Sequence, residues 1–547
     1  MLKYAINQRR FFLLLLGALV TGCQTARFQT AEDASLFATQ YAAPDLLASS
    51  LPELIAQLNS GKTTSFELVS SYMKRIEQLD RKGPNLRSII TLNPEAISIA
   101  ERMDSLRRQG KVLGPLHGVP ILLKDNIESK DNMPTTAGAL ALSNNFTDRD
   151  SPLVAGLRAQ GAIILGKTNL SQWANFRSES SMSGWSALAG QVRNPHMLDR
   201  NPCGSSSGSG SATAASLAAA SVGTETNGSI ICPANANGIV GFKPTVGVIP
   251  QTHIIPISKT QDTAGPMTKT VKGAAIMMNA MAGNSTRIDY LSGLDKNSLS
   301  GVRVGVLKFA QGSSKPIIDL FNQSLADLKS AGAILVEIEK GPQLSKEYWS
   351  KSYDLLKYEF KHGLNQYLAS TDSAKVIVRD LAQLIQFNQT NHSSELALFD
   401  QSIFIASQAL GSLEDEQYQS ARALVPSASK KTIDDLMESY NVSVLVAPSG
   451  PIIPRIDPIN GDVWPNDWPG AGTYAARAGY PHITVPMGGV NHLPVGLSFI
   501  GSHNQDARIL SFAFAYEQIS KRKLNPNYFK TAEDVPSINR AMSGIKE

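Results

Sequence analysis

The sequence is poor in the residues that most often carry metal or thiol chemistry. It has three cysteines and eight histidines among 547 residues. None of them falls into an H-E-x-x-H motif or a Cys/His zinc spacing, and no acidic metal cluster appears. A phosphate-binding loop is also missing, because the Gly/Ser run Gly204–Gly210 has no following G-K-[ST]. We therefore expect no metal ion and no other cofactor.

Charge is scarce as well. Charged residues make up 18% of the chain, and the formal net charge is +5. Three of the positive charges, on Lys3, Arg9 and Arg10, stand within the first 22 residues, so the rest of the chain is nearly neutral. A basic surface of the kind that binds nucleic acid is absent, and we expect no nucleic-acid partner. The apolar share of 42% is ordinary for a globular protein.

The apolar run near the start, Phe11–Val20, is too short to span a bilayer comfortably. It follows basic residues and leads into Val20-Thr-Gly-Cys23, which is typical of a secretory signal that ends in a lipobox. We expect cleavage before Cys23 and lipid on its thiol; an uncleaved signal anchor is the alternative. Residues 1–22 are then a signal peptide and 23–49 a tether. The protein would be a periplasm-facing membrane lipoprotein, and Gln24 favours the outer membrane.

Two cysteines remain once Cys23 carries lipid. Cys203 stands just before Ser205 and Cys232 just after Ser229. Exported proteins can keep disulfides, so pairing is one interpretation, but we expect two buried thiols near a site. A cysteine nucleophile is disfavoured, because no histidine stands at a motif position beside either thiol.

Short apolar runs alternate with helical patterns along the chain. The capping box Thr64–Glu67 begins an amphipathic helix, and another helical pattern covers Pro316–Ser330. This alternation predicts an α/β layered sheet. We place the folded domain at residues 50–525, a helical covering region at 342–440 and a C-terminal tail at 526–547. The predicted strands before residue 450 are Arg87–Leu92, Val119–Leu123, Ala162–Leu165, Val302–Val306, Ile334–Ile338 and Val444–Val446.

The stretch Pro202–Gly247 holds two glycine-flanked serines, Ser205 and Ser229, separated by an Ala-rich segment of helical composition. Glycine beside serine lets the backbone approach a ligand closely. It also lets N–H groups converge on an anion, as an oxyanion hole requires. Two other loops are less informative. Ser178–Ser186 is expected to be a surface loop, and Trp464–Gly472 fits either the rim of a cleft or a plain loop.

A nucleophilic serine needs a base, and the usual histidine is missing. His117 is the nearest candidate, and its place in a turn favours a structural role. Lys124 ends the buried strand Val119–Leu123, where desolvation disfavours its charged form and makes it a potential base. The alternative is that Lys124 pairs with Asp125 or a distant acid. A G-x-S-x-G elbow at Ser207–Gly210 is only a loose match in a repetitive Gly/Ser segment.

Three spaced motifs together resemble the amidase signature family. They are GPLHGVPILLKDN with Lys124, GSSSG with Ser205 and Ser206, and GTETNGS ending at Ser229. The resemblance spans about Pro52 to Lys521. Segments at Met182–Ala187, Asn201–Gly208 and Thr473–Gly488 are closest to bacterial peptide amidases, which release ammonia from C-terminal peptide amides. The resemblance implies a large mixed twisted β-sheet covered by helices on both faces.

The resemblance also implies a Ser-cisSer-Lys triad. Ser229 would be the nucleophile, Ser205 the bridging serine after a cis peptide bond and Lys124 the base. Ser206 would support this network. Backbone N–H groups of Thr226, Asn227, Gly228 and Ser229 would form the oxyanion hole. Asn227 departs from the family, which usually has paired glycines before the nucleophile, and Ser207 and Ser209 also replace glycine or small residues.

Other functions stay open at this point. An amidotransferase A-type subunit resembles the same family, but it would need partner subunits and cytoplasmic tRNA, which the export signal opposes. Aryl, fatty-acid or cyclic-oligoamide hydrolases share the fold and differ in the substrate channel. An inactive lipoprotein that binds peptides is opposed by the intact Lys124, Ser205 and Ser229. We expect a monomer that acts on a small-molecule or peptide amide.

Overall fold

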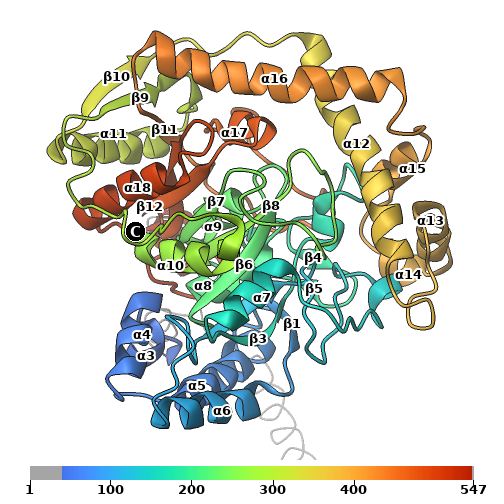
Figure 1. Ribbon diagram of the computed structural model, residues 1–547. Helices are drawn as coiled ribbons and strands as arrows, with labels where there is room; N and C mark the ends of the chain where they lie inside the picture. The colour runs from blue at the N-terminus through green and yellow to red at the C-terminus, as the bar shows by residue number, and fades with distance from the viewer. Residues whose placement is uncertain (1–39, 545–547) are drawn as a thin grey trace, which may run out of the picture.

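The fold is built on a mixed sheet of 11 strands in the order β1-β3-β2-β6-β8-β7-β12-β13-β11-β9-β10 (Figure 1). The computed structural model describes residues 40–544, so the predicted signal peptide and Cys23 lie outside the described residues. The strands are β1 (Ile89–Leu92), β2 (Pro120–Lys124), β3 (Ile163–Thr168), β6 (Ala220–Glu225), β7 (Val240–Lys243), β8 (Thr263–Thr268), β9 (Arg303–Leu307), β10 (Ile334–Ile338), β11 (Val444–Pro448), β12 (His482–Val490) and β13 (Leu493–Ile500). A separate hairpin pairs β4 (Trp185–Ser186) with β5 (Gly190–Gln191).

Parallel and antiparallel pairs both occur in this sheet. Strand β2 lies parallel to β3 and to β6, and β9 lies parallel to β10 and to β11, whereas the middle pairs are antiparallel. The central strands β2, β3 and β6 are buried along their whole length. Strands buried on both faces read as continuous apolar runs, which is why the sequence predicted most of them. The α/β class and the large mixed sheet are confirmed.

Helices cover the sheet. They are α3 (Asp45–Ala48), α4 (Leu51–Asn59), α5 (Ser65–Ile76), α6 (Ala96–Arg108), α7 (Pro152–Ala159), α8 (Ser207–Ala214), α9 (Ile231–Asn237), α10 (Val271–Ala282), α11 (Lys315–Ser330), α12 (Lys346–Ala369), α13 (Leu381–Thr390), α14 (His392–Glu395), α15 (Ser402–Gln408), α16 (Glu416–Ser439), α17 (Gly472–Ala478), α18 (Asp506–Ser520) and α19 (Pro536–Ser543). The predicted capping box is present, because Thr64 and Glu67 cap α5 reciprocally.

The two faces of the sheet carry different helices. Helices α7, α10, α18 and α11 form a row in which each contacts the next, and the row crosses the front of the sheet in Figure 1. Along β7, Gly241 faces α9, whereas Val240 and Phe242 belong to the core shared with α10 and α18. Since neighbouring residues of a strand point to opposite faces, α9 lies on the other side of the sheet. The predicted cover on both faces is confirmed.

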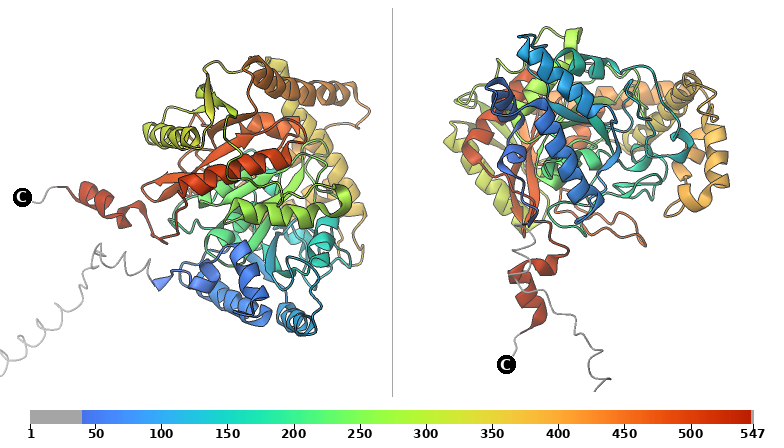
Figure 2. Two further views of the ribbon diagram at one scale, coloured as in Figure 1. Left: turned by 60° about the vertical axis from the view of Figure 1, so that its left-hand side comes forward. Right: turned by 90° about the horizontal axis from the view of Figure 1, so that it is seen from below.

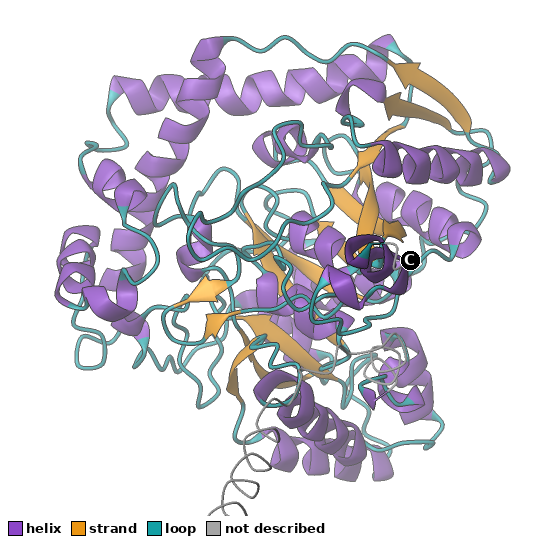
Figure 3. Cartoon of the chain, turned by 180° about the vertical axis from the view of Figure 1, so that it is seen from behind, coloured by secondary structure: helices purple, strands orange, loops and turns teal. Residues whose placement is uncertain are grey.

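Helices α12 to α16 arch along the top and one side of the sheet in Figure 1, and the same arch is seen from behind in Figure 3. They fall within residues 342–440, which the sequence predicted to be mostly helical. Their inner side chains, among them Phe360 and Leu364, share a core with Trp173 and Phe176 from the loop after β3. The arch therefore covers loops at one end of the sheet.

Both predicted tails are partly folded onto the body. Leu47 of α3 is buried, although residues 23–49 were predicted to be a tether. Arg75 of α5 donates hydrogen bonds to Tyr41 O and to Tyr528 Oη, which joins both ends of the chain to the core. Helix α19, near the end of the described residues, projects from the body (Figure 2). No helix within residues 40–544 is long and apolar enough to cross a membrane.

The Ala-rich segment after Ser205 is not one helix, as its composition suggested. Helix α8 ends at Ala214, and Ala220 begins β6, which enters the sheet between β2 and β8. Small residues are needed here for close packing: a Cβ on Gly208 of α8 would lie 2.2 Å from Ser88 O. Tertiary packing thus overrides the helical preference of alanine.

Candidate active site

Lys124 ends β2, which lies between β3 and β6 in the sheet; it stands opposite Thr168 of β3 and is fully buried. Its Nζ lies 2.8 Å from Ser205 Oγ, 2.8 Å from Thr224 Oγ1 and 3.2 Å from Thr224 O. Burial lowers the pKa of Lys124 to about 7, although the charges of Asp262 and Glu225 oppose this shift. The amine is therefore poised to exchange a proton near neutral pH.

The neighbouring Asp125 is not the partner of Lys124. Its carboxylate accepts hydrogen bonds from the backbone N–H and the hydroxyl of Thr136, and burial raises its pKa to about 6. Its electrostatic partner is Lys167. Within residues 40–544, Lys124 forms no ion pair at salt-bridge distance, so the alternative of a simple structural pair fails.

Ser205 stands two residues before the start of α8. The Gly204–Ser205 peptide bond is cis, as the family resemblance implied. Ser205 is fully buried, and its carbonyl accepts a hydrogen bond from Ser171 N at 3.1 Å. Together with the Lys124 contact, this interaction holds Ser205 beside the lysine, while the next residue, Ser206, contacts the loop that carries Ser229.

Ser206 joins the two serine loops. Its backbone N–H donates to Ser229 O at 3.1 Å. Its hydroxyl donates to Thr224 O at 3.0 Å and accepts from Thr224 N at 3.2 Å. The structure thus places Lys124, Ser205, Ser206 and Ser229 around the end of β6, where the sequence predicted a single site.

The segment Thr226–Ser229 follows β6 as a turn. Gly228 has a φ of +84°, a conformation that favours glycine. Thr226 Oγ1 donates to Asp262 Oδ1 at 2.6 Å, and Glu225 Oε2 accepts from the backbone N–H groups of the residues at 230 and 231. Asn227, the departure from the family pattern, is exposed and accepts a hydrogen bond from Thr473 Oγ1 at 3.3 Å.

A cavity of about 320 Å³ opens beside the two loops, and we call it the first cavity. Gly204 and Gly228 line it, as do Trp464 and Trp468 from the Pro/Gly/Trp-rich loop. The interpretation of that loop as the rim of a cleft is therefore confirmed. Glu225 also lines the cavity, and its Oε1 is buried without a hydrogen-bond partner within residues 40–544.

The sequence missed several residues of this cavity. Ser183 lines it, although Ser178–Ser186 was predicted to be a surface loop, and Asn175, Ser449 and His482 also line it. Ser183 is held inward because its N–H donates to Asp462 Oδ2 at 3.0 Å. No local pattern marks these positions, since they come from three segments far apart in the sequence. Burial lowers the pKa of His482 to about 3, so its ring is neutral.

His117 has the structural role expected from the sequence. Its ring Nε2 lies 2.9 Å from Met103 O, and its Nδ1 accepts from Leu113 N at 3.1 Å. Both ring nitrogens are therefore used in holding a turn. Within the described residues, no group of three or more His, Cys, Asp or Glu side chains is arranged to hold a metal ion.

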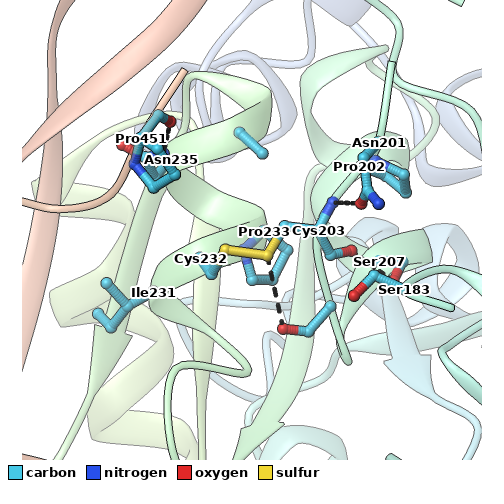
Figure 4. The surroundings of a disulfide bond; sticks show 12 residues. Ser183, Asn201, Pro202, Cys203, Ser207, Ile231, Cys232, Pro233, Asn235 and Pro451 are labelled. Atoms are coloured by element: carbon cyan, nitrogen blue, oxygen red, sulfur yellow. Dashed lines mark hydrogen bonds between the residues drawn. A yellow bond between two sulfur atoms is a disulfide. The ribbon is translucent and has the colours of Figure 1, made fainter. Parts of the chain in front are cut away.

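The expectation of two free thiols is wrong. Cys203 and Cys232 form a disulfide with their Cα atoms 5.8 Å apart (Figure 4). The physical reason is the contact between the two serine loops, because the hydrogen bond from Ser206 to Ser229 brings their flanking cysteines together. Both cysteines line the first cavity. The disulfide and the hydrogen bond from Ser206 to Ser229 therefore link the two serine loops at two points, on either side of Ser205.

Comparison with known proteins finds similarity to amidases and to amidotransferase subunits. A family model described as Amidase matches residues 67–510. The solved structure of native peptide amidase from Stenotrophomonas maltophilia is 42% identical with a TM-score of 0.83, covering 88% of this chain and 98% of that one. A putative amidase of Arthroderma benhamiae is 34% identical over 84% of this chain and 79% of its own length. The A-type subunit of the glutamyl-tRNA(Gln) amidotransferase from Acinetobacter baumannii is 32% identical over 87% of this chain and 96% of its own length.

The disulfide predicts a double effect of its removal. We expect the pair Cys203→Ala and Cys232→Ala to lower the free energy of unfolding by about 2–4 kcal/mol, because the closed loop restricts the unfolded chain. Turnover should also fall, since both serine loops gain freedom. Denaturant unfolding and steady-state kinetics measure the two effects. Unchanged stability, or two free thiols in the purified protein exported to an oxidising compartment, would contradict the bridge.

Proposed function

The chain belongs to the amidase family, and from this premise we propose that it hydrolyses a carboxamide to a carboxylate and ammonia through an acyl-enzyme on Ser229. It is an amide hydrolase that acts on a C–N bond. In the proposal, Ser205 relays the proton and Lys124 is the base. The observation that carries it is the contact of the fully buried Lys124 with Ser205 at 2.8 Å.

The surroundings of Lys124 suit a neutral amine. A neutral amine has two N–H groups and one lone pair. The two oxygens of Thr224 accept the N–H groups, which directs the lone pair toward the Ser205 hydroxyl. Asn126 Nδ2 also donates to Thr224 Oγ1 at 3.0 Å and fixes that hydroxyl. Thr224 is therefore a positioning residue for the base.

The reaction proceeds in two halves. Lys124 takes the Ser205 proton while Ser205 takes the Ser229 proton, and Ser229 Oγ attacks the carbonyl carbon. The oxyanion is stabilised by backbone N–H groups of the turn at 226–229. Return of the proton along the same route to the nitrogen breaks the C–N bond and releases ammonia. Water then attacks the acyl-enzyme by the same relay and frees the carboxylate and Ser229.

We propose peptide C-terminal amides as the substrate class. The identity of 42% to a peptide amidase over almost all of that chain supports this choice over aryl, fatty-acid and cyclic amides. An amidotransferase A-type role is the main rival, since such a subunit is 32% identical. The Cys203–Cys232 bridge opposes it, because structural disulfides are rare in the cytosol, where tRNA-dependent synthesis occurs.

Substitution of the three proposed catalytic residues tests the mechanism. Ser229→Ala should abolish ammonia release from an acetylated amino-acid amide, and Lys124→Met or Ser205→Ala should lower kcat by at least about 10³-fold. The matched control is Ser211→Ala in α8, a serine of the same Gly/Ser-rich segment as Ser205, whose hydroxyl donates to Arg193 O; it should keep normal turnover. Circular dichroism verifies folding. Near-normal turnover in Lys124→Met would refute the proton route.

The pH dependence tests the base independently. Because the pKa of Lys124 is lowered to about 7, the neutral form is lost as pH falls through 7. We expect kcat/KM to fall tenfold per pH unit on the acid side and to level off above it. Asp262 raises the pKa of Lys124 through its charge, so Asp262→Asn should move the acid limb to lower pH. An acid limb that stays in place or moves to higher pH would contradict the assignment of Lys124 as the base.

For residues 1–23 we propose a cleaved signal peptide and a lipid-bearing Cys23 that anchors the enzyme in the outer membrane, facing the periplasm. The support is the sequence pattern together with the disulfide, which suits an oxidising compartment. The described part of the chain begins at residue 40, so the test is biochemical.

Cys23→Ser should leave the protein unlipidated and uncut by the lipoprotein signal peptidase, because the thiol is the lipid acceptor. Fatty-acid labelling and mobility on gels measure both outcomes. Gln24→Asp is the matched variant, and it should keep the lipid but move the protein to the inner membrane. Lipidated or globomycin-sensitive Cys23→Ser protein would refute the anchor.

A further inference from the structure

A second cavity adjoins the first. It measures about 410 Å³ and shares three lining residues with the first cavity, namely Asn175, Ser183 and Trp464. Its other walls come from the serine-rich turn at 178–181, from Tyr353 of α12 and from the turn Asn460–Asp462. Cavities that share walls in this way provide room for a ligand longer than one amino-acid residue.

The shared wall is rigid. Asp462 Oδ1 accepts from Asn201 Nδ2 at 2.7 Å, and its Oδ2 accepts from Ser183 N at 3.0 Å. Asp462 also accepts a hydrogen bond from the Trp464 side chain. The Trp464 ring packs edge-on against Trp468 with ring centroids 5.1 Å apart. Trp464 is thus held at the junction, whereas Trp468 lines the first cavity only.

The walls present hydrogen-bond acceptors that need a donor. Glu225 Oε1 in the first cavity and Asn175 Oδ1 at the junction are both buried without a partner within residues 40–544. A buried acceptor without a donor costs free energy. A peptide supplies an N–H group at every residue, whereas a fatty or aryl amide has none beyond the amide that is cleaved. These two unpartnered acceptors, one in the first cavity and one at the junction, therefore favour a peptide.

Charge adds a second preference. Glu225, Glu179 and Asp462 are the charged residues that line the two cavities, and no Lys or Arg lines either of them. Glu179 is exposed on the wall of the second cavity and has no ion-pair partner within the described part of the chain. An acidic peptide would meet repulsion here, and a basic side chain or an N-terminal ammonium would meet attraction.

We propose that the two cavities form one groove for a peptidyl amide of two or more residues, that the groove favours neutral and basic residues, and that Trp464 joins its halves. This inference rests on the proposed function, because the carboxamide must lie at Ser229. The C-terminal residue then occupies the first cavity, and the preceding residues occupy the second.

A substrate series tests the groove. The probes are acetyl-leucinamide and three longer amides, acetyl-alanyl-X-leucinamide with lysyl, glutaminyl or glutamyl at X. We expect kcat/KM of the glutaminyl peptide to exceed that of acetyl-leucinamide about tenfold, since remote binding energy promotes the chemical step. The kcat/KM of the lysyl peptide should exceed that of the glutaminyl peptide about two- to fivefold, as for a partly exposed ion pair. The glutamyl peptide should have the lowest kcat/KM of the three long amides. Equal rates for short and long amides, or a preference for the glutamyl peptide, would overturn the inference.

Paired variants locate the effect. Trp464→Ala should remove most of the advantage of the long amides, whereas Trp468→Ala should lower short and long amides alike. Glu179→Gln should bring the ratio of lysyl to glutaminyl rates close to one. Its control, Glu414→Gln, removes an exposed acid outside both cavities and should leave that ratio unchanged. The reverse pattern within either pair would overturn the roles assigned to Trp464 and Glu179.

Binding separates this inference from the proposed function. The same amides are titrated calorimetrically into Ser229→Ala, which cannot form the acyl-enzyme. If affinities follow length and charge but the wild-type protein releases no ammonia, the groove stands and the proposed function fails. If acetyl-leucinamide is hydrolysed but affinities and rates do not depend on the length and charge of the amide, the proposed function stands and the groove fails.

Discussion

The desolvation of Lys124 is the constraint on which the site depends. An amine buried at the end of β2, between β3 and β6, has no water to stabilise its charge. The fold meets this cost with uncharged partners: the two Thr224 oxygens accept the N–H groups of the amine, and the Ser205 hydroxyl contacts its nitrogen. An adjacent carboxylate would keep the lysine protonated and would remove the base. The absence of a close acid within residues 40–544 is therefore as much a part of the site as the serines are.

The Gly/Ser composition around Ser205 is a packing requirement. A Cβ on Gly204 would lie 2.2 Å from Ser171 Oγ, and one on Gly208 would lie 2.2 Å from Ser88 O. The small hydroxyls of α8 then form hydrogen bonds with the strands beneath, as when Ser209 Oγ donates to Val222 O of β6. This packing brings the N-terminus of α8 under the turn that carries Ser229. A sequence that reads as a flexible loop is thus one of the most buried parts of the protein.

Much of the fold and of the candidate site could be predicted where the local sequence pattern and the burial agree. The strand that carries Lys124 and the start of β3 beside it are apolar runs, and the motifs at residues 124, 205 and 229 carry enough family information to imply the triad. The predictions failed where neighbours far apart in sequence decide the outcome. Ala220 joins β6 because a slot exists between β2 and β8, and Cys203 meets Cys232 because Ser206 binds Ser229. The walls of the first cavity come from loops at 175–183 and 464–473 that no local periodicity connects.

Two carboxylates link the chemistry of the base to the shape of the oxyanion turn. Asp262 and Glu225 both raise the pKa of Lys124 through their charges. Asp262 also holds Thr226 at the start of the turn, and Glu225 holds the N–H groups that directly follow Ser229. A change in either acid therefore alters the protonation of the base and the position of the oxyanion donors together. Within residues 40–544 neither acid forms an ion pair with Lys124 at salt-bridge distance, and both accept hydrogen bonds from the turn, so burial still lowers the pKa of the lysine to about 7. The same arrangement leaves Glu225 Oε1 free to face the cavity, so one carboxylate connects the base, the turn and the substrate.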